Sequence, residues 1–281
     1  MKKRFYHVLF LCGVLMGILC SCSDKKPETS ALVEDETPKD STEEVEDSIP
    51  IIPQAPKAAD KLFADFFFDF TTKKKIQMNR IKFPLEIVEN GKTTLVQRGA
   101  WKMERFYQNQ EYYTQIFDSE KQRESVSKKD VDTVVVEKIQ LKKGIVEQYV
   151  FNHPDGFWIL ANINRVGLKD CKNASFLTFL QTFFADKKYQ MAHVATPLKY
   201  VGPDPDGDDE STVVKRNIPA SSWSEYVPEI PRDQIYNILY GQVYSEGNEK
   251  VFLFKGISNG LETELQFKKS GGNWKLVKIR L

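Results

Sequence analysis

Two pairs of polar residues lie in otherwise apolar stretches of this sequence and are the side chains best suited to chemistry. Gln77 and Arg80 form the first pair, and Gln190 and His193 form the second at the same spacing. An amide both donates and accepts hydrogen bonds, whereas a guanidinium only donates. His193 is the one candidate catalytic residue, as a general base, but the neighbouring helix offers only Asp186 to orient it. The pairs are therefore candidate binding residues first.

Each pair also has a structural interpretation, which we favour. In it the glutamine ties down backbone at a helix end, and Arg80 or His193 pairs across its domain. The tryptophans allow the same two interpretations, because aromatic residues line pockets for sugars, sterol-like molecules or peptides but are more often core. Six residues remain as candidate ligand contacts: Gln77, Arg80, Gln190, His193, Trp101 and Trp223.

An acidic segment, 204–210, is a candidate calcium site. Asp204, Asp206 and Asp208 alternate as the oxygen ligands of a calcium loop do. However, Gly207 stands at the fourth position of such a loop instead of the sixth, and Lys215 occupies the twelfth, where a glutamate belongs. We favour a solvated turn and expect neither a metal nor a cofactor, since no HxH, HExxH or CxxC pattern is present.

The polar pairs belong to two copies of one repeated unit. Residues 63–88 align with residues 176–201, and ten of the 26 aligned positions are identical. Gly144, Gly156 and Trp158 recur 116 residues further along. A period this long indicates duplicated domains rather than a solenoid of short repeats.

Both copies predict the same order of elements. A Phe-rich stripe with helical spacing opens each copy, and a short second helix follows, which Pro84 or Pro197 is predicted to end. A hairpin and a short helical segment beginning at Trp101 or Trp223 come next. Each copy ends in an antiparallel meander, predicted at 134–142, 144–151 and 158–166 and again at 251–257, 261–267 and 274–280.

This order resembles the nuclear transport factor 2-like (cystatin-like) cone fold, in which a curved antiparallel sheet wraps a long N-terminal helix. The motif Gln77-x-x-Arg80-Ile81-x-Phe83-Pro84-Leu85, with Gly-x-Trp before the last strand, is similar to an uncharacterised Bacteroidetes lipoprotein family, a domain of unknown function. The resemblance covers residues 59–281. It implies an α+β fold of two tandem cone-shaped domains, 59–168 and 169–281, with a ligand pocket usually at the mouth of each cone.

The second copy departs from that motif. His193 replaces Arg80, and Thr196 replaces Phe83. If these positions line a pocket, the two copies should not bind the same ligand. We expect the two domains to pack as a pseudo-dimer within a monomeric chain.

The first 21 residues predict an export signal. Basic residues 2–4 precede an apolar stretch, 8–19, that is too short to span a bilayer. Leu19-Cys20-Ser21-Cys22 then resembles a bacterial lipobox, which implies cleavage before Cys22 and a diacylglyceryl group on its thiol. Cys20 fits this motif less well, and an ordinary secretory signal is the alternative.

Residues 22–58 predict a disordered acidic tether. Eleven acids and four lysines fall in residues 23–60, and the tether lacks aromatic residues, so it cannot bury enough apolar surface to fold. Around Ser41 and Ser48 the sequence resembles the Asp-Ser/Thr acceptor for O-glycosylation in exported Bacteroidetes proteins. Plain linker composition is the alternative.

Charge and cysteine content narrow the function further. The formal net charge of +1 leaves no basic cluster for nucleic acid. Once the signal is removed and Cys22 is acylated, Cys171 alone remains, so we expect no intramolecular disulfide.

The sequence therefore favours a lipid-anchored cell-envelope protein that acts as a non-catalytic binding or scaffolding module. Its expected partners are the membrane, through the acylated cysteine, and a small molecule or an envelope protein. We expect it at the outer membrane facing the periplasm, with surface exposure as the alternative. Two other functions stay open: an isomerase or dehydratase of the cone fold that uses His193, and a purely structural lipoprotein.

Overall fold

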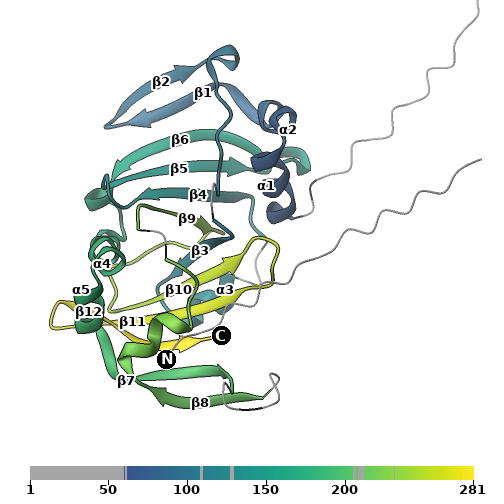
Figure 1. Cartoon of the computed structure of the whole chain (residues 1–281). Coiled ribbons are helices and arrows are strands. Elements are labelled where there is room, and N and C mark those ends of the chain that lie inside the picture. The colour runs from purple at the N-terminus through teal and green to yellow at the C-terminus, as the bar shows by residue number, and fades with distance from the viewer. Residues whose placement is uncertain are drawn as a thin grey trace, which may run out of the picture. The chain divides into compact units, whose positions relative to one another are not determined.

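A computed structural model describes residues 60, 62–107, 110–126, 130–204, 207, 212–230 and 232–281. These residues fall in one compact unit, 56–281, that combines few helices with a large curved sheet of twelve strands (Figure 1). Among the described residues, no helix has the length and apolar character needed to cross a membrane.

The first copy contributes α1 (Phe63–Thr72), α2 (Lys74–Asn79), β1 (Ile81–Glu89), β2 (Lys92–Val96), η1 (Arg98–Ala100), β3 (Tyr112–Phe117), α3 (Glu120–Val126), β4 (Thr133–Gln140), β5 (Ile145–Asn152), η2 (Pro154–Gly156) and β6 (Ile159–Gly167). The second contributes η3 (Leu168–Asp170), α4 (Ala174–Ala185), α5 (Lys187–Ala192), β7 (Val194–Pro203), β8 (Val213–Ile218), η4 (Ala220–Glu225), β9 (Gln234–Leu239), β10 (Glu249–Gly256), β11 (Glu262–Ser270) and β12 (Asn273–Arg280). The predicted Phe-rich helices, hairpins and meanders are confirmed, whereas β3, β9 and α3 were not predicted.

The two copies interlock because each gives one strand to the other. Taken in order, β1–β6 correspond to β7–β12, and the sheet order is β2-β1-β6-β5-β4-β9-β3-β10-β11-β12-β7-β8. The strand β9 therefore pairs with β4, and β3 pairs with β10, through six antiparallel residue pairs each. Where β3 meets β9, the two strands run parallel and Thr114 lies opposite Asn237. The two copies therefore share one continuous sheet, and the division of the chain into two domains at residue 168 stays a prediction.

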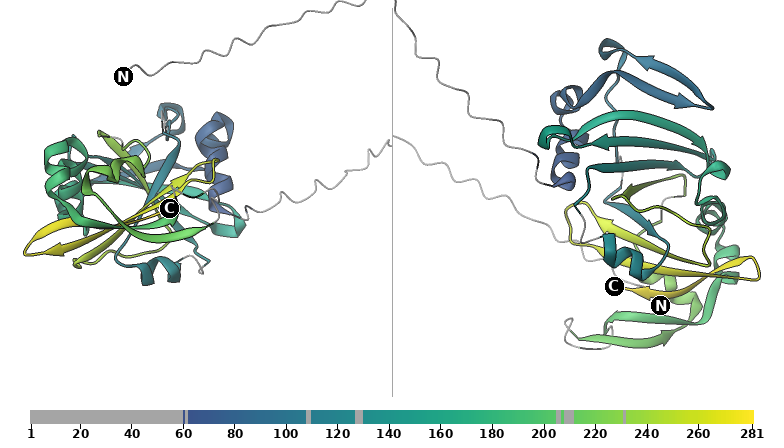
Figure 2. Two further views of the ribbon diagram at one scale, coloured as in Figure 1. Left: turned by 60° about the horizontal axis from the view of Figure 1, so that its bottom comes forward. Right: turned by 180° about the vertical axis from the view of Figure 1, so that it is seen from behind.

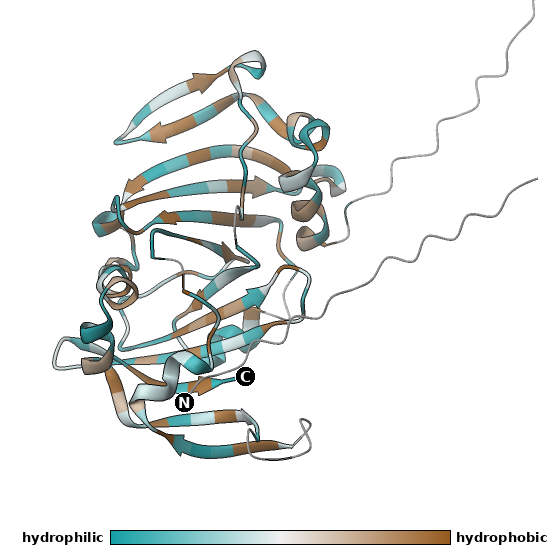
Figure 3. Cartoon of the chain, viewed as in Figure 1, coloured by the Kyte–Doolittle hydropathy of each residue, from teal (hydrophilic) through white to brown (hydrophobic). Residues whose placement is uncertain are grey.

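The α1 and α4 helices cover opposite faces of this sheet. On β4, Val134 and Val136 pack in the cluster of α1, whereas Ile139 packs in the cluster of α4. Because neighbouring side chains on a strand point to opposite faces, odd and even positions of β4 serve different cores. Figure 2 gives two further views of this arrangement, and Figure 3 shows hydrophobic and hydrophilic residues along the strands.

Aromatic side chains fill the space between each helix and its sheet. The first cluster contains Phe63, Phe66, Phe67, Phe70, Phe106, Phe151 and Trp158, and the second contains Phe176, Phe179, Phe183, Trp223, Phe267 and Trp274. Most ring contacts are tilted or edge-on, as with Phe70 and Phe151 at 5.1 Å, an arrangement that aromatic quadrupoles favour. Both Phe-rich helices are thus core elements.

The prediction that Pro84 and Pro197 end the short helices is wrong. The α2 helix ends at Asn79 and α5 ends at Ala192, and both prolines lie inside strands, β1 and β7. Each proline follows a cis peptide bond and lies where the register against β6 or β12 shifts. Proline has no N–H for a ladder, so sheets accept it at such irregular positions.

Gln77 ties the first copy together from inside its core. Its Nε2 atom donates to the carbonyl oxygens of Phe70 and Glu104, both at 3.0 Å. Its Oε1 atom accepts from the Glu104 amide at 2.8 Å and from the Trp101 indole at 3.1 Å. All the donors and acceptors of this fully buried side-chain amide are therefore engaged in hydrogen bonds within the fold. The helical segment predicted to begin at Trp101 instead ends before it, at Ala100.

Replacing Gln77 by leucine should lower the free energy of unfolding by about 2–4 kcal/mol, because it strands buried backbone and indole groups without partners. The matched change in the second copy, Gln190→Leu, should alter it by no more than about 0.5 kcal/mol, because Gln190 is only half-buried. Urea unfolding of both variants measures this. Equal losses would contradict the assignment.

Strand exchange can be tested with cysteine pairs in a Cys171→Ser background. Tyr113 on β3 lies opposite Lys255 on β10. The Tyr113→Cys/Lys255→Cys protein should form an intramolecular disulfide, identified by peptide mass mapping, because opposed strand residues have Cβ atoms about 4.5–5.5 Å apart. The pair Tyr113→Cys/Ile139→Cys, which would lie together if β3 stayed with its own copy, should remain reduced. The reverse pattern would rule out the exchange.

Candidate functional site

Two predicted ligand contacts, Gln190 and Trp223, come together at one pocket of the second copy. The pocket has a volume of about 370 Å³ and lies between the end of α4, α5, η4 and the segment 227–230. Phe184 and Trp223 supply apolar walls, and both are almost fully buried. Charged side chains stand at its exposed margin: Lys187, Glu229 and Arg232.

The equivalent position of the first copy is closed, because the backbone near Trp101 approaches Gln77. There the amide of Glu104 donates to Gln77. In the second copy η4 continues to Glu225, and the amide of Tyr226 donates to the carbonyl oxygen of Trp223 at 3.2 Å. Because η4 has one extra turn of 3-10 helix, the Tyr226 amide is already hydrogen-bonded and does not bind Gln190 as the Glu104 amide binds Gln77.

Arg80 pairs with Asp60, the first residue that the structure describes. Its two terminal nitrogens donate to the Asp60 carboxylate at 2.8 and 3.2 Å, and its guanidinium carbon lies 4.8 Å from the ring centre of Phe157. Asp60 also accepts from the Trp158 amide at 3.0 Å. A bidentate pair of this kind fixes geometry, so Arg80 links the end of α2 to the segment before α1 and to the segment before β6.

His193 lies at the C-terminal end of α5 and stacks on Tyr189, with ring centres 3.8 Å apart. Its Nδ1 atom is 2.8 Å from the Tyr189 carbonyl oxygen. Asp186, the one neighbouring carboxylate, instead caps α5 by accepting from the amides of Lys188 and Tyr189. Among the described residues no carboxylate bonds to His193, so the geometry provides no orienting group for a general base.

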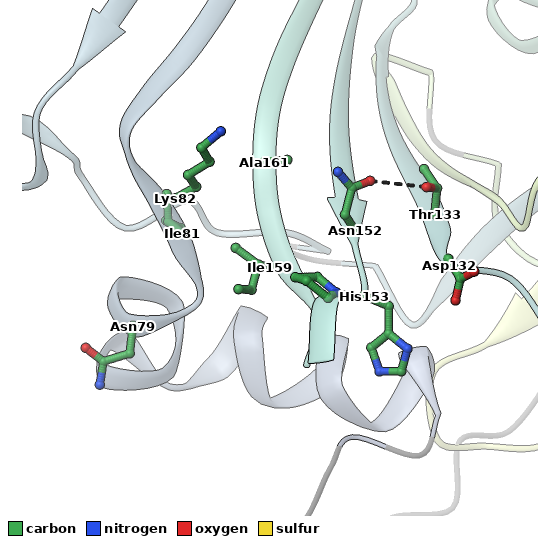
Figure 4. Close-up of a pocket in the computed structure, with 10 residues that line it drawn as sticks. Asn79, Ile81, Lys82, Asp132, Thr133, Asn152, His153, Ile159 and Ala161 are labelled. Carbon is green, nitrogen blue, oxygen red and sulfur yellow. Dashed lines mark hydrogen bonds between the residues drawn. The ribbon is translucent and has the colours of Figure 1, made fainter. Parts of the chain in front are cut away.

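A wider hollow opens over the first copy, with a volume of about 660 Å³ (Figure 4). Thr133 donates to Asn152 at 3.1 Å on its wall, and the His153 ring stacks on Trp158 at 4.3 Å. Lys82 and Asp132 add opposite charges to its lining. None of the six predicted ligand contacts lines this hollow.

The polar centre at the junction of the two copies was missed by sequence reasoning. Glu137 on β4 is 4% exposed, and its two oxygens accept from Gln148 at 3.0 Å and Asn237 at 2.8 Å. Asn237 also donates to the Tyr244 hydroxyl at 2.7 Å. Burial raises the pKa of Glu137, although these hydrogen bonds partly offset the effect. Strand exchange creates this centre, since it places Asn237 opposite Glu137.

A signal for this centre was present in the repeat. At the constant spacing of 116 residues, Glu137 aligns with Leu253. A charged residue in one copy thus replaces an apolar residue in the other, within a stretch of otherwise buried strand. Leu253 packs in a small apolar cluster beneath α3.

Several predicted sites lie outside the described residues: Cys22, Ser41, Ser48, Asp206 and Asp208. Asp204 is described, and its carboxylate is 3.9 Å from Arg216. No group of three or more possible metal ligands occurs in the described part of the chain. Cys171 is a free thiol, and burial raises its pKa to about 12.

The chain is similar to a crystallised nuclear transport factor 2-like protein from Bacteroides fragilis NCTC 9343. The two share 31% sequence identity with a TM-score of 0.73, over 80% of this chain and 98% of that one. No curated protein matches the chain. Residues 41–280 match the family described as Domain of unknown function (DUF4348). The fold is therefore nuclear transport factor 2-like, and the chain belongs to the DUF4348 family.

Proposed function

We propose that this protein is a lipid-anchored, non-catalytic binding module of the cell envelope. Its fold is compatible with both small-molecule binding and enzyme activity, so the choice between these two functions depends on the side chains at the candidate sites. The observation that carries the proposal is the open pocket at Gln190 and Trp223, whose first-copy counterparts, Gln77 and Trp101, bond to each other instead.

The composition of the pocket indicates what it can hold. Its apolar walls suit a flat or aliphatic group, and the Gln190 amide can pair with one donor or acceptor of the ligand. The margin carries two cations, Lys187 and Arg232, and one acid, Glu229. We therefore favour an occupant with an apolar body and an anionic group, either a small molecule or a segment of an envelope protein.

The other two functions receive less support. An enzyme based on His193 would need an orienting carboxylate, and Asp186 is engaged in capping α5. A purely structural lipoprotein agrees with the two aromatic cores, but it gives no reason for a pocket that opens in one copy and is closed in the other.

Strand exchange supports an intramolecular pseudo-dimer, because each copy completes the half-sheet of its partner within one chain. We propose that Cys22 carries a diacylglyceryl anchor and that residues 23–58 tether the folded unit to the outer membrane, facing the periplasm. The export signal and lipobox-like sequence support this placement.

Filling the pocket should abolish occupancy. A Gln190→Trp variant places an indole in the cavity, whereas Lys188→Trp adds the same group to the exposed surface of α5 as a control. Native mass spectrometry of protein purified from its host should detect a bound species on wild type and on the control and lose it from Gln190→Trp. A bare wild-type protein, or a species that survives Gln190→Trp, would contradict binding at this pocket.

Anchoring depends on one thiol in this account. Cys22→Ser should leave the signal uncleaved and unacylated, and the mass of the N-terminal peptide should lack the diacylglyceryl group that wild type carries. Cys20→Ser should be processed like wild type, apart from the change in the discarded signal. An acylated Cys22→Ser protein would place the anchor elsewhere.

A further inference from the structure

A second cavity, of about 350 Å³, lies beside Glu137 at the junction of the two copies. It shares no lining residue with the Gln190–Trp223 pocket. Strands β4 and β5, the turn before α4 and the segment 242–244 form its walls. Its polar lining includes Glu137, Gln148, Asn173 and Tyr244.

Polar side chains at and next to this cavity carry buried atoms without a hydrogen-bond partner. Among the described residues no cation forms an ion pair with Glu137. Asn173, which is 2% exposed, has no hydrogen-bond partner in the described chain at either its Oδ1 or its Nδ2 atom. The Oδ1 atom of Asn237, whose amide nitrogen bonds Glu137, is likewise buried without a partner. Buried polar groups are normally satisfied, so these unpartnered amide atoms are unusual.

Apolar side chains complete the lining: Val166, Leu177, Leu239 and Val243. The other ionisable groups at the cavity are Tyr244, Cys171, Asp170 and Lys172. Burial raises the pKa of both Tyr244 and Cys171, so these two groups are neutral at physiological pH. Asp170 and Lys172 carry opposite charges, which leaves the Glu137 carboxyl as the uncompensated group.

We propose that this cavity binds a small aliphatic primary amine, with the ammonium group on Glu137 and Asn173 and the carbon chain against the apolar walls. An ammonium has three donors and no acceptor, which complements the Glu137 carboxylate and the unpartnered Oδ1 atom of Asn173. Its positive charge would also offset the cost of an ionised carboxylate in a buried site.

The second copy lacks such a site. Leu253 replaces Glu137 at the equivalent position of the second copy, and α3 covers the sheet around Leu253. Arg123 on α3 pairs with Glu262 and Glu264, so the acids of that face already have a cation of their own. An amine site is therefore expected once in the chain, at the first-copy position.

The test compares n-butylammonium with n-butanol, which has the same carbon chain and no charge, by isothermal titration calorimetry on the purified full chain in detergent. Butylammonium should bind at one site about tenfold or more tightly than butanol, because a hydrogen bond to a charged group contributes about 1.5–3 kcal/mol. Affinity should fall as the pH is lowered, because burial raises the pKa of Glu137 and its carboxyl must be ionised to receive the ammonium.

Variants locate the site. Glu137→Gln should reduce butylammonium affinity about tenfold or more and leave butanol binding unchanged, while Glu86→Gln, which removes the same charge from an exposed position of β1, should bind like wild type. Asn173→Ala removes no hydrogen bond of the fold, so it should weaken amine binding without loss of stability. Equal affinities for amine and alcohol, no amine binding to wild type, or undiminished binding to both Glu137→Gln and Asn173→Ala would overturn the proposal.

Discussion

The exchange of β3 and β9 is the constraint on which the rest of the structure depends. Each of these strands pairs along six residues with a strand of the other copy, so neither half-sheet is complete without the other. The two helix clusters inherit this arrangement. Tyr236 and Ile238 of β9 pack in the core of α1, and Tyr112 and Ile116 of β3 pack in the core of α4. Separating the copies would therefore expose a strand edge and open both cores at once.

Duplication supplied two similar scaffolds, and small local differences gave them different surfaces. A longer 3-10 helix in the second copy releases Gln190 from the role that Gln77 has in the first. A glutamate in place of a leucine gives the face beneath segment 242–244 a polar cavity, whereas at the equivalent position beneath α3 Leu253 packs in a small apolar cluster. The shared residues mainly maintain packing, and the differences between the copies mark the sites proposed for binding.

Much of the fold could be predicted from periodicity. The Phe stripes and the alternating meanders gave correct helices and strands because their patterns record burial on one face. Strands β3 and β9 were not predicted because their partners lie more than 90 residues away, and no local pattern reveals that pairing. The prediction that Pro84 ends a helix was wrong for a related reason. Pro84 lies at a register shift in β1, and that shift is defined only by the pairing with β6.

The sites were less predictable than the fold. Gln190 and Trp223 were selected from the sequence as candidate contacts, and they share a pocket. The sequence did not reveal that the equivalent position at Gln77 is closed, because that depends on the backbone geometry near Glu104. Glu137 was visible only as a mismatch between copies.

The most direct test of the central claim is native-state hydrogen exchange in increasing denaturant. If exchanged strands make the copies one cooperative unit, the amides of β4–β6 and β10–β12 should converge on a single free energy of opening, together with those of β3 and β9. Two separate values, one for each copy, would contradict this account.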